Sequence, residues 1–80
     1  MKIDIKDILA LNDNNEYVVT SIVNYDNKTY YYLVDIKNTS NIKFCYREND
    51  ELIEIENKKL ITKLLPMFFE TAKNVIENIN

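Results

Sequence analysis

The amino-acid sequence predicts an α+β fold, in which an antiparallel meander of four or five strands is followed by one C-terminal helix. Three observations support this prediction. Up to residue 56, apolar residues tend to recur at every second position, which is the period of a strand. Two-residue turns at Asp26-Asn27 and Asn49-Asp50 divide this region into hairpins. After Asn57 the apolar spacing changes to three and four residues, as in an amphipathic helix. We expect one domain over residues 1–80.

The first hairpin carries the strongest strand signal. The predicted strands of the chain, in order, are residues 7–11, 16–25, 29–37, 42–48 and 51–56. Pairing the two long arms around Asp26-Asn27 gives four cross-strand pairs on one face, which are Val23–Tyr30, Ser21–Tyr32, Val19–Val34 and Tyr17–Ile36. Because a slip by one residue would move every side chain to the other face, this pattern predicts one continuous apolar face.

The second hairpin alternates in the same way. Its first strand separates into one face with Ile42, Phe44 and Tyr46 and another with Lys43, Cys45 and Arg47. In the return strand, Ile53 and Ile55 should lie opposite Tyr46 and Phe44. Both hairpins therefore predict apolar side chains on the same side of the sheet.

The C-terminal helix begins after Asn57, whose side chain suits an N-cap. Pro66 lacks an amide hydrogen, so we expect a kink or a break near Leu64-Leu65, with Pro66 opening a second helical segment. The predicted apolar stripe consists of Leu60, Ile61, Leu64, Leu65, Phe68, Ala72, Val75, Ile76 and Ile79. It should pack on the sheet face that carries Tyr17, Val19, Val34, Ile36, Phe44 and Ile55. Strong bending would instead close the strands into a small SH3-like barrel.

The second face of the predicted sheet is also apolar. It carries Leu9, Val18, Ile22, Tyr31 and Leu33. A two-layer domain should present a polar face to water there, so something covers these residues. Three covers fit the sequence: the N-terminal Ile3 and Ile5, closure of the barrel, and a partner chain. The excess apolar surface on a short chain predicts a homo-oligomer, most simply a twofold dimer.

Composition excludes several functional classes. The 80 residues contain no histidine and no glycine, so the commonest general base and the glycine-rich phosphate loop are both missing. The single cysteine, Cys45, cannot form an internal disulfide and favours a reducing compartment. No apolar run is long enough to span a membrane, and the first residues lack a signal-peptide core. We expect a cytoplasmic protein that is not an enzyme and binds no cofactor, metal or membrane.

Charge is distributed unevenly along the chain. Residues 1–56 carry six basic and eleven acidic side chains, whereas residues 57–80 carry four lysines and two glutamates. The acidic run from Glu48 to Glu56 is typical of a solvated strand edge, and its loop is too short for a calcium site.

Tyr31 is the one residue of the Tyr30-Tyr31-Tyr32 triplet that points away from the helix, and sheet packing explains it better than base stacking. Cys45 lies in a strand, where a lone cysteine is usually inert.

The order of these features resembles that of small acidic domains of unknown function in low-GC Gram-positive bacteria and their phages. The segments that carry the resemblance are residues 7–11, 15–19, 28–34, the acidic hairpin and residues 60–68. The resemblance includes no catalytic signature. It implies an accessory protein of a bacterium or a mobile element.

These observations predict a small protein-interaction module, such as a phage-borne inhibitor of a host nucleic-acid enzyme that acts like an anti-CRISPR protein. Acidic strands would occupy a basic groove and compete with nucleic acid. The predicted partner-binding residues are Asp26, Asp35, Glu48, Asp50, Glu51, Glu54, Glu56, Tyr31 and Phe69. One alternative is direct binding of nucleic acid through Lys58, Lys59, Lys63 and Lys73, which the acidic body of the chain disfavours. A purely structural or oligomerisation domain is the other.

Overall fold

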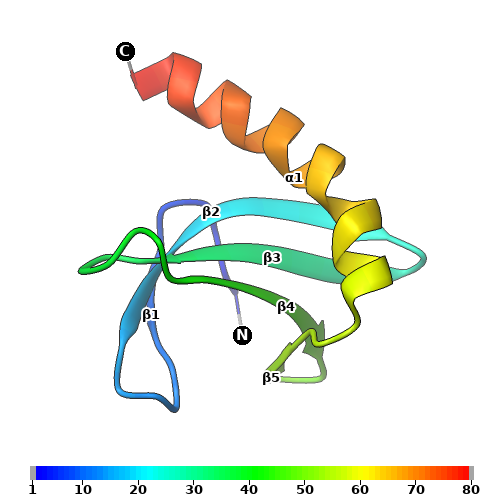
Figure 1. Cartoon of the computed structure of the whole chain (residues 1–80), viewed down its shortest axis with the longest axis horizontal. Coiled ribbons are helices and arrows are strands. Elements are labelled where there is room, and N and C mark those ends of the chain that lie inside the picture. The colour runs from blue at the N-terminus through cyan, green and yellow to red at the C-terminus, as the bar shows by residue number, and fades with distance from the viewer. Residues whose placement is uncertain (1, 80) are drawn as a thin grey trace.

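The computed structural model confirms the α+β fold, with a curled antiparallel sheet and one C-terminal helix (Figure 1). It describes the backbone of residues 2–79 and the side chains of residues 2–71. The elements in order are β1 (Ile8–Ala10), β2 (Glu16–Tyr25), β3 (Lys28–Asp35), β4 (Ile42–Glu48), β5 (Glu51–Glu54) and α1 (Lys58–Ile79). The strands lie in the sheet in chain order, so β1 and β5 are its two edges.

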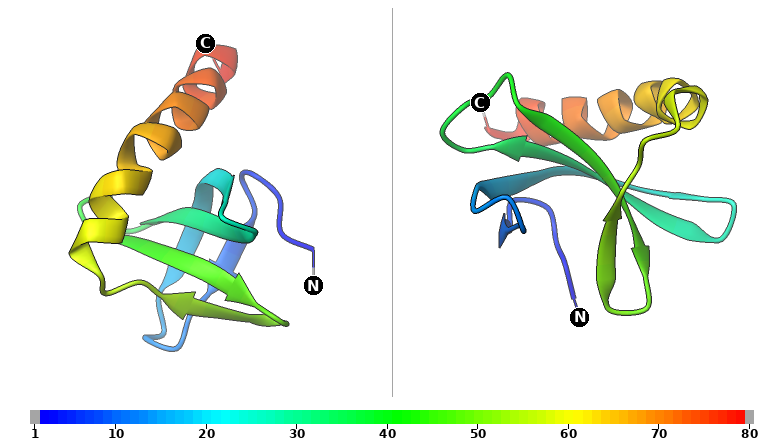
Figure 2. Two further views of the ribbon diagram at one scale, coloured as in Figure 1. Left: turned by 90° about the vertical axis from the view of Figure 1, so that its right-hand side faces the viewer. Right: turned by 60° about the horizontal axis from the view of Figure 1, so that its bottom comes forward.

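The sheet curls into a half-barrel. Figure 2 shows that the N-terminal segment and the β4–β5 hairpin both lie on the side of the sheet away from α1. The inner face of the curl is therefore partly enclosed by the sheet itself, and α1 lies against the outer face. The curl explains why the two predicted architectures, a two-layer sheet and a small barrel, both describe part of this fold.

A β-bulge at Thr20 overturns part of the predicted register of the first hairpin. Val23 pairs with Tyr30 and Ser21 with Tyr32, as predicted, but Val19 then pairs with Leu33. One extra residue in β2 shifts the pairing by one, so the side chains before Thr20 change face. The predicted pairs Val19–Val34 and Tyr17–Ile36 are therefore wrong, and Val34 lies opposite Val18 instead, with Asp35 opposite Tyr17.

The bulge divides the apolar residues into two cores. The inner core consists of Ile3, Tyr17, Val19, Tyr31, Leu33 and Cys45, with Ile5, Leu9, Leu11, Ile22 and Leu52 packed against it. The outer core, beneath α1, consists of Val23, Tyr30, Ile55, Leu64 and Phe68, with Tyr25, Tyr32, Phe44, Tyr46, Leu60 and Ile61 around it. Tyr17 and Val19, which we predicted beneath the helix, thus belong to the opposite face. Phe44 and Ile55 lie beneath α1 as predicted.

The N-terminal segment covers the inner core together with the curl of the sheet, so two of the three covers that the sequence allowed contribute. Ile3 is buried and Ile5 packs against the same cluster. The backbone of this segment pairs with β2 beside the bulge, because the Lys6 amide donates to the Val19 carbonyl and the Val19 amide donates to the Asp7 carbonyl, both at 2.8 Å. The chain turns at Lys6, which has a positive φ of 76°, an uncommon conformation for lysine that these paired amides hold in place.

Asparagine and aspartate provide the predicted turns. Asp26 and Asn27 both have positive φ, at 51° and 63°, as a two-residue type I′ hairpin turn requires. Asn57 caps α1, since its side-chain oxygen accepts from the amides of Lys59 and Leu60 at 3.0 and 3.3 Å. α1 is one helix with Pro66 inside it, so the break that the sequence allowed does not occur. The stripe residues Ala72, Val75, Ile76 and Ile79 lie outside the described side chains.

Candidate functional site

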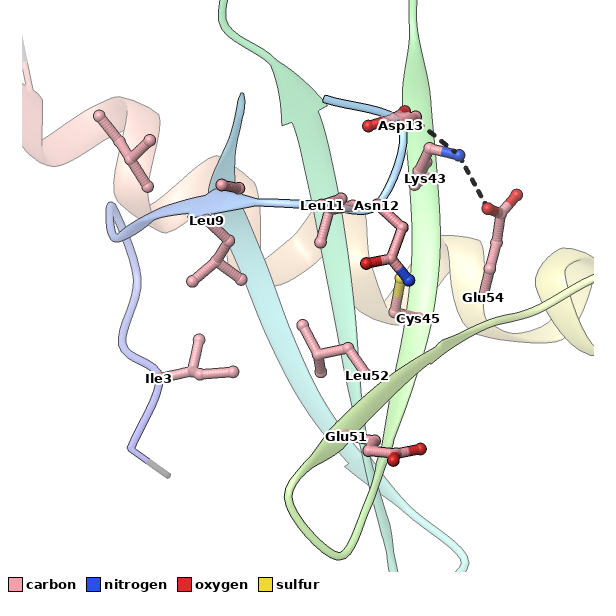
Figure 3. A pocket seen from close by; sticks show the side chains of 12 residues that line it. Ile3, Leu9, Leu11, Asn12, Asp13, Lys43, Cys45, Glu51, Leu52 and Glu54 are labelled. Carbon is pink, nitrogen blue, oxygen red and sulfur yellow. Dashed lines mark hydrogen bonds and ion pairs between the residues drawn. The ribbon is translucent and has the colours of Figure 1, made fainter. Parts of the chain in front are cut away.

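An open groove lies on the inner side of the half-barrel, between the edge strands β1 and β5. Its volume is about 970 Å³. The groove is lined by Ile3, Ile8, Leu9, Ala10, Leu11, Asn12, Asp13, Lys43, Cys45, Glu51, Leu52 and Glu54. Figure 3 shows Ile3, Leu9, Leu11 and Leu52 around an apolar centre, with Asp13, Lys43 and Glu54 together at one end. The groove is the gap that remains because the sheet does not close into a full barrel.

The polar end of the groove is organised by Lys43 of β4. Its ammonium lies 2.8 Å from a Glu54 carboxylate oxygen and 3.7 Å from a carboxylate oxygen of Asp13. The hydrogen bond with Glu54 is the main reason that the pKa of Lys43 is raised. Lys43 therefore stays charged and links the β1–β2 turn to β5 across the opening (Figure 3).

A second polar cluster continues from Asp13 into the protein. The hydroxyl of the fully buried Tyr17 donates to Asp13 at 2.6 Å and accepts from the Asn41 side-chain amide at 2.9 Å. Asn41 also donates to Asp35 at 3.1 Å. The hydrogen bond from Tyr17 is the main cause of the lowered pKa of Asp13, and burial is the main cause of the raised pKa of Tyr17. The cluster satisfies a buried hydroxyl and ties two loops together, which is a structural role.

Cys45 lies in the wall of the groove but is only 2% exposed. Burial raises the pKa of its thiol to about 11. A nucleophilic cysteine needs a lowered pKa and an accessible sulfur. The structure therefore places Cys45 among the packing residues of the inner core, as the sequence predicted.

The predicted partner-binding residues fall into an exposed and a buried set. The carboxylates of the acidic hairpin (Glu48, Asp50, Glu51, Glu54 and Glu56) are exposed, as are Asp26 and Phe69. By contrast, Tyr31 is 2% and Asp35 5% exposed. The Asp35 carboxylate accepts from the amide of Lys37, the main cause of its lowered pKa. Tyr31 and Asp35 are therefore buried in the interior and are not part of the exposed acidic surface.

The residues of the alternative basic site do not form one cluster in the described part of the chain. Lys58 and Lys59 are exposed in the first turn of α1. Lys63 lies over the Tyr25 ring, with its ammonium 5.1 Å from the ring centroid, and a hydrogen bond with Tyr25 raises its pKa. The side chain of Lys73 lies outside the described residues. The described lysines therefore cover the start of α1 without defining a strip for phosphates.

Over the described residues, no three Cys, Asp or Glu side chains gather closely enough to hold a metal ion, and the absence of a metal stays a prediction. No helical segment of the described chain combines the length and the hydropathy that a membrane crossing requires. Neither protein-family models, nor curated proteins, nor solved structures give a match to this chain.

The groove is not evident from the sequence. The alternation of apolar residues predicts Leu9 on the inner face, as the structure confirms, but nothing in the sequence connects Leu11, Asp13, Lys43 and Leu52 with one another. They come from β1, the following turn, β4 and β5, and only the curl of the sheet brings these segments together. The one available signal was the excess of apolar residues on the second face.

Proposed function

We propose that this chain is a non-catalytic protein-binding module that offers the acidic hairpin to a basic protein surface. One observation carries the proposal. Residues 48–56 contain five carboxylates and no lysine or arginine, and all five of these side chains are exposed on one projecting hairpin and the segment after it. Lys43 lies 2.8 Å from Glu54 and Arg47 lies 3.9 Å from Asp50, and these cations offset part of the negative charge of the two carboxylates. Glu48, Glu51 and Glu56 are therefore the main contributors to the negative potential of the hairpin.

A nucleic-acid-binding protein is the partner class that this surface suits best. Its groove carries a dense positive potential for phosphates, and a projecting acidic strand can occupy the same groove. Such binding would inhibit the partner by competition, in agreement with the resemblance to proteins of phages and mobile elements. Charged rims mainly accelerate association, so the affinity should fall steeply with added salt.

Affinity capture from the native host, with nuclease treatment, tests the proposal. The triple variant Glu48→Lys, Glu51→Lys, Glu56→Lys should lose a stoichiometric protein partner. The matched control is Asp4→Lys, Glu16→Lys, Glu70→Lys, which changes the net charge equally at exposed positions outside the hairpin, and it should retain the partner. Capture that requires intact nucleic acid and is abolished by Lys59→Glu with Lys63→Glu would contradict the proposal and support the alternative.

We also propose a homodimer, which the outer face of the sheet supports. The register sets Ile8 opposite Val18, Val18 opposite Val34 and Val34 opposite Ile42, so an apolar row crosses four strands. Ile8 is 58%, Ile42 39% and the nearby Ile36 42% exposed. These residues lie on the same face as the outer core but are not part of it. Exposed apolar surface of this kind is characteristic of interfaces.

The oligomeric state at about 100 µM, a generous concentration for a specific interface, checks this proposal. Light scattering should give the mass of two chains, and Ile42→Glu should return the mass of one chain without loss of the sheet signal in circular dichroism. A wild-type monomer at this concentration would contradict the dimer and leave the interaction module unaffected.

A further inference from the structure

We infer that the groove between β1 and β5 binds an extended peptide segment of alternating apolar and basic residues, which adds to the sheet as a strand between its two edges. The inference rests on the proposed function, because it specifies how a basic protein partner would be held. The groove shares Glu51 and Glu54 with the acidic hairpin, so variants at Ala10 on one side and at Glu48 and Glu56 on the other test the two separately.

The edge of β1 has backbone groups directed toward the groove. The Val19 amide donates to the Asp7 carbonyl and the Leu11 amide donates to the Asn15 carbonyl. Leu9 lies two residues from both Asp7 and Leu11 and pairs with Tyr17, so its backbone groups also point toward β2. Residues of an antiparallel strand bond alternately to one neighbour and to the other side. The amides and carbonyls of Ile8 and Ala10 therefore point away from β2, toward the open edge.

The edge of β5 is arranged in the same way on the other side. The Ile55 amide donates to the Phe44 carbonyl at 2.7 Å, and Ile53 lies opposite Tyr46. By the same alternation, the backbone groups of Leu52 and Glu54 point away from β4. Both edges thus present donors and acceptors for a further strand.

The directions of the edges select one orientation for that strand. In a meander whose neighbours are all antiparallel, the first and fifth strands run in the same direction. A segment that runs opposite to both would complete an all-antiparallel ring of six strands. Since β1 has three residues and β5 has four, about three or four residues of a peptide would be paired.

The side chains of the groove specify the sequence of the peptide. An inserted strand would direct every second residue inward, where Leu9, Leu11 and Leu52 contact the inner core. The remaining residues would face outward at the rim. Asp13, Glu51 and Glu54 line the groove, and Lys43 is the one cation among its lining residues. Glu54 shares the inner face with Cys45, whereas Glu51 lies on the outward side of β5 opposite Glu48. Lysine or arginine is therefore the complementary choice for the outward residues beside Glu51.

β1 is short, but it carries none of the side chains that usually block a sheet edge. Its residues are Ile8, Leu9 and Ala10, with no charge and no proline. Natural proteins usually block exposed edges with such residues, because an open edge pairs with other chains. Addition of a strand is an established mode of peptide recognition that uses this feature.

The test uses fluorescence anisotropy with the full chain and a labelled peptide of about seven residues that alternates valine and lysine. Two further peptides carry N-methyl groups on the valine amides or on the lysine amides. Both should bind about tenfold or more weakly, because one set of amides would face β1 and the other β5. Equal affinity for the parent and both methylated peptides, or a loss in only one of them, would overturn the inference.

Variants of the protein provide the second arm. Ala10→Pro removes an edge amide without removing a β1–β2 bond and should weaken binding, as should Glu51→Lys, whereas Glu16→Lys should not. If Ala10→Pro fails to fold, the methylated peptides still decide the question.

Two further outcomes would overturn the inference. If the chain binds no peptide but self-associates, and Ala10→Pro abolishes the self-association, the groove belongs to a second copy of the chain. Partner capture that depends on Glu48 and Glu56 but not on Ala10 would overturn the inference while leaving the proposed function intact.

Discussion

The inner and outer cores of this protein are built from the same sheet but closed in different ways. α1 closes the outer core with aromatic contacts, in which Phe68 meets Tyr32 and Phe44 at centroid distances of 5.8 and 5.7 Å. The inner core is closed by the curl of the sheet and by the N-terminal segment, and it ends in the polar cluster of Asp13, Tyr17 and Asn41. The outer face is therefore covered by one helix, whereas the inner face is covered by several short segments of the chain.

The largest effect should come from truncation in the outer core. Phe68→Ala should lower the free energy of unfolding by about 3–5 kcal/mol, because Phe68 is fully buried and its removal leaves a cavity. Phe69→Ala is the matched control, since Phe69 is 53% exposed and should contribute far less. Chemical denaturation of both variants measures the difference. Equal losses would show that α1 does not pack as described.

A smaller loss is expected where the N-terminal segment closes the inner core. Ile3→Ala should cost about 2 kcal/mol, the lower end of the range for a buried isoleucine, because Ile3 lies near the end of the chain. Met67→Ala is the control, since Met67 is 36% exposed and lies outside both the inner core and the apolar row proposed for the dimer. The same denaturation experiment applies. If Ile3→Ala were neutral, the N-terminal segment would not be the cover of the inner core.

A stabilising substitution is expected at the bulge that separates the two cores. Ser21 is fully buried, and its hydroxyl has no hydrogen-bond partner within the described structure. An unsatisfied buried hydroxyl is costly, so Ser21→Ala should raise the free energy of unfolding by roughly 1 kcal/mol. The measurement is the shift in the denaturation midpoint, with Thr20→Ala as the neighbouring control. A loss of stability in Ser21→Ala would indicate that the hydroxyl has a partner after all.

The smallest effect is the pH dependence of stability, which comes from two carboxylates of the polar cluster beside the inner core and from Cys45 within it. The folded pKa values of Asp13 and Asp35 are lowered below 3.8, so their contribution to stability is present above that pH and is lost as the pH falls through the folded values. The pKa of Cys45 is raised from 9.0 to about 11, so stability should also fall as the pH rises through this window. Melting temperatures measured from pH 2 to 11 follow the loss of stability at both acidic and alkaline pH. Asp35→Asn should reduce the loss of stability at acidic pH, and an unchanged loss would contradict the role of this carboxylate.

Much of the fold was predictable because local chemistry determined it. Asn and Asp at the turns, the N-cap Asn57 and the spacing of Leu60, Ile61, Leu64 and Phe68 act over a few residues, and the structure confirms each of them. The second hairpin also paired as predicted, with Ile53 opposite Tyr46. Its two faces differ clearly in polarity, so alternation allows only one register.

The candidate site was not predictable to the same degree. In β2, Tyr17, Val18 and Val19 are apolar in succession, so either face can be buried and alternation does not reveal the bulge at Thr20. The exchange of faces then buries Tyr17 and Val19 inside the curl and leaves Val18 in the outer apolar row. Asp35 was predicted at a partner surface because it is charged, but its hydrogen bonds with Lys37 and Asn41 hold it inside.

The order of the elements, the positions of the turns and the acidic character of the second hairpin follow from neighbouring residues and from composition, and they can be predicted from the sequence. The face that each half of β2 presents, the cover of the inner core and the groove between β1 and β5 become apparent only in the folded chain. Those features depend on contacts between segments far apart in the chain, such as Lys43 with Asp13 and Glu54. A single bulge, which shifts the pairing of β2 with β3 by one residue, determines which side chains belong to each of the two cores.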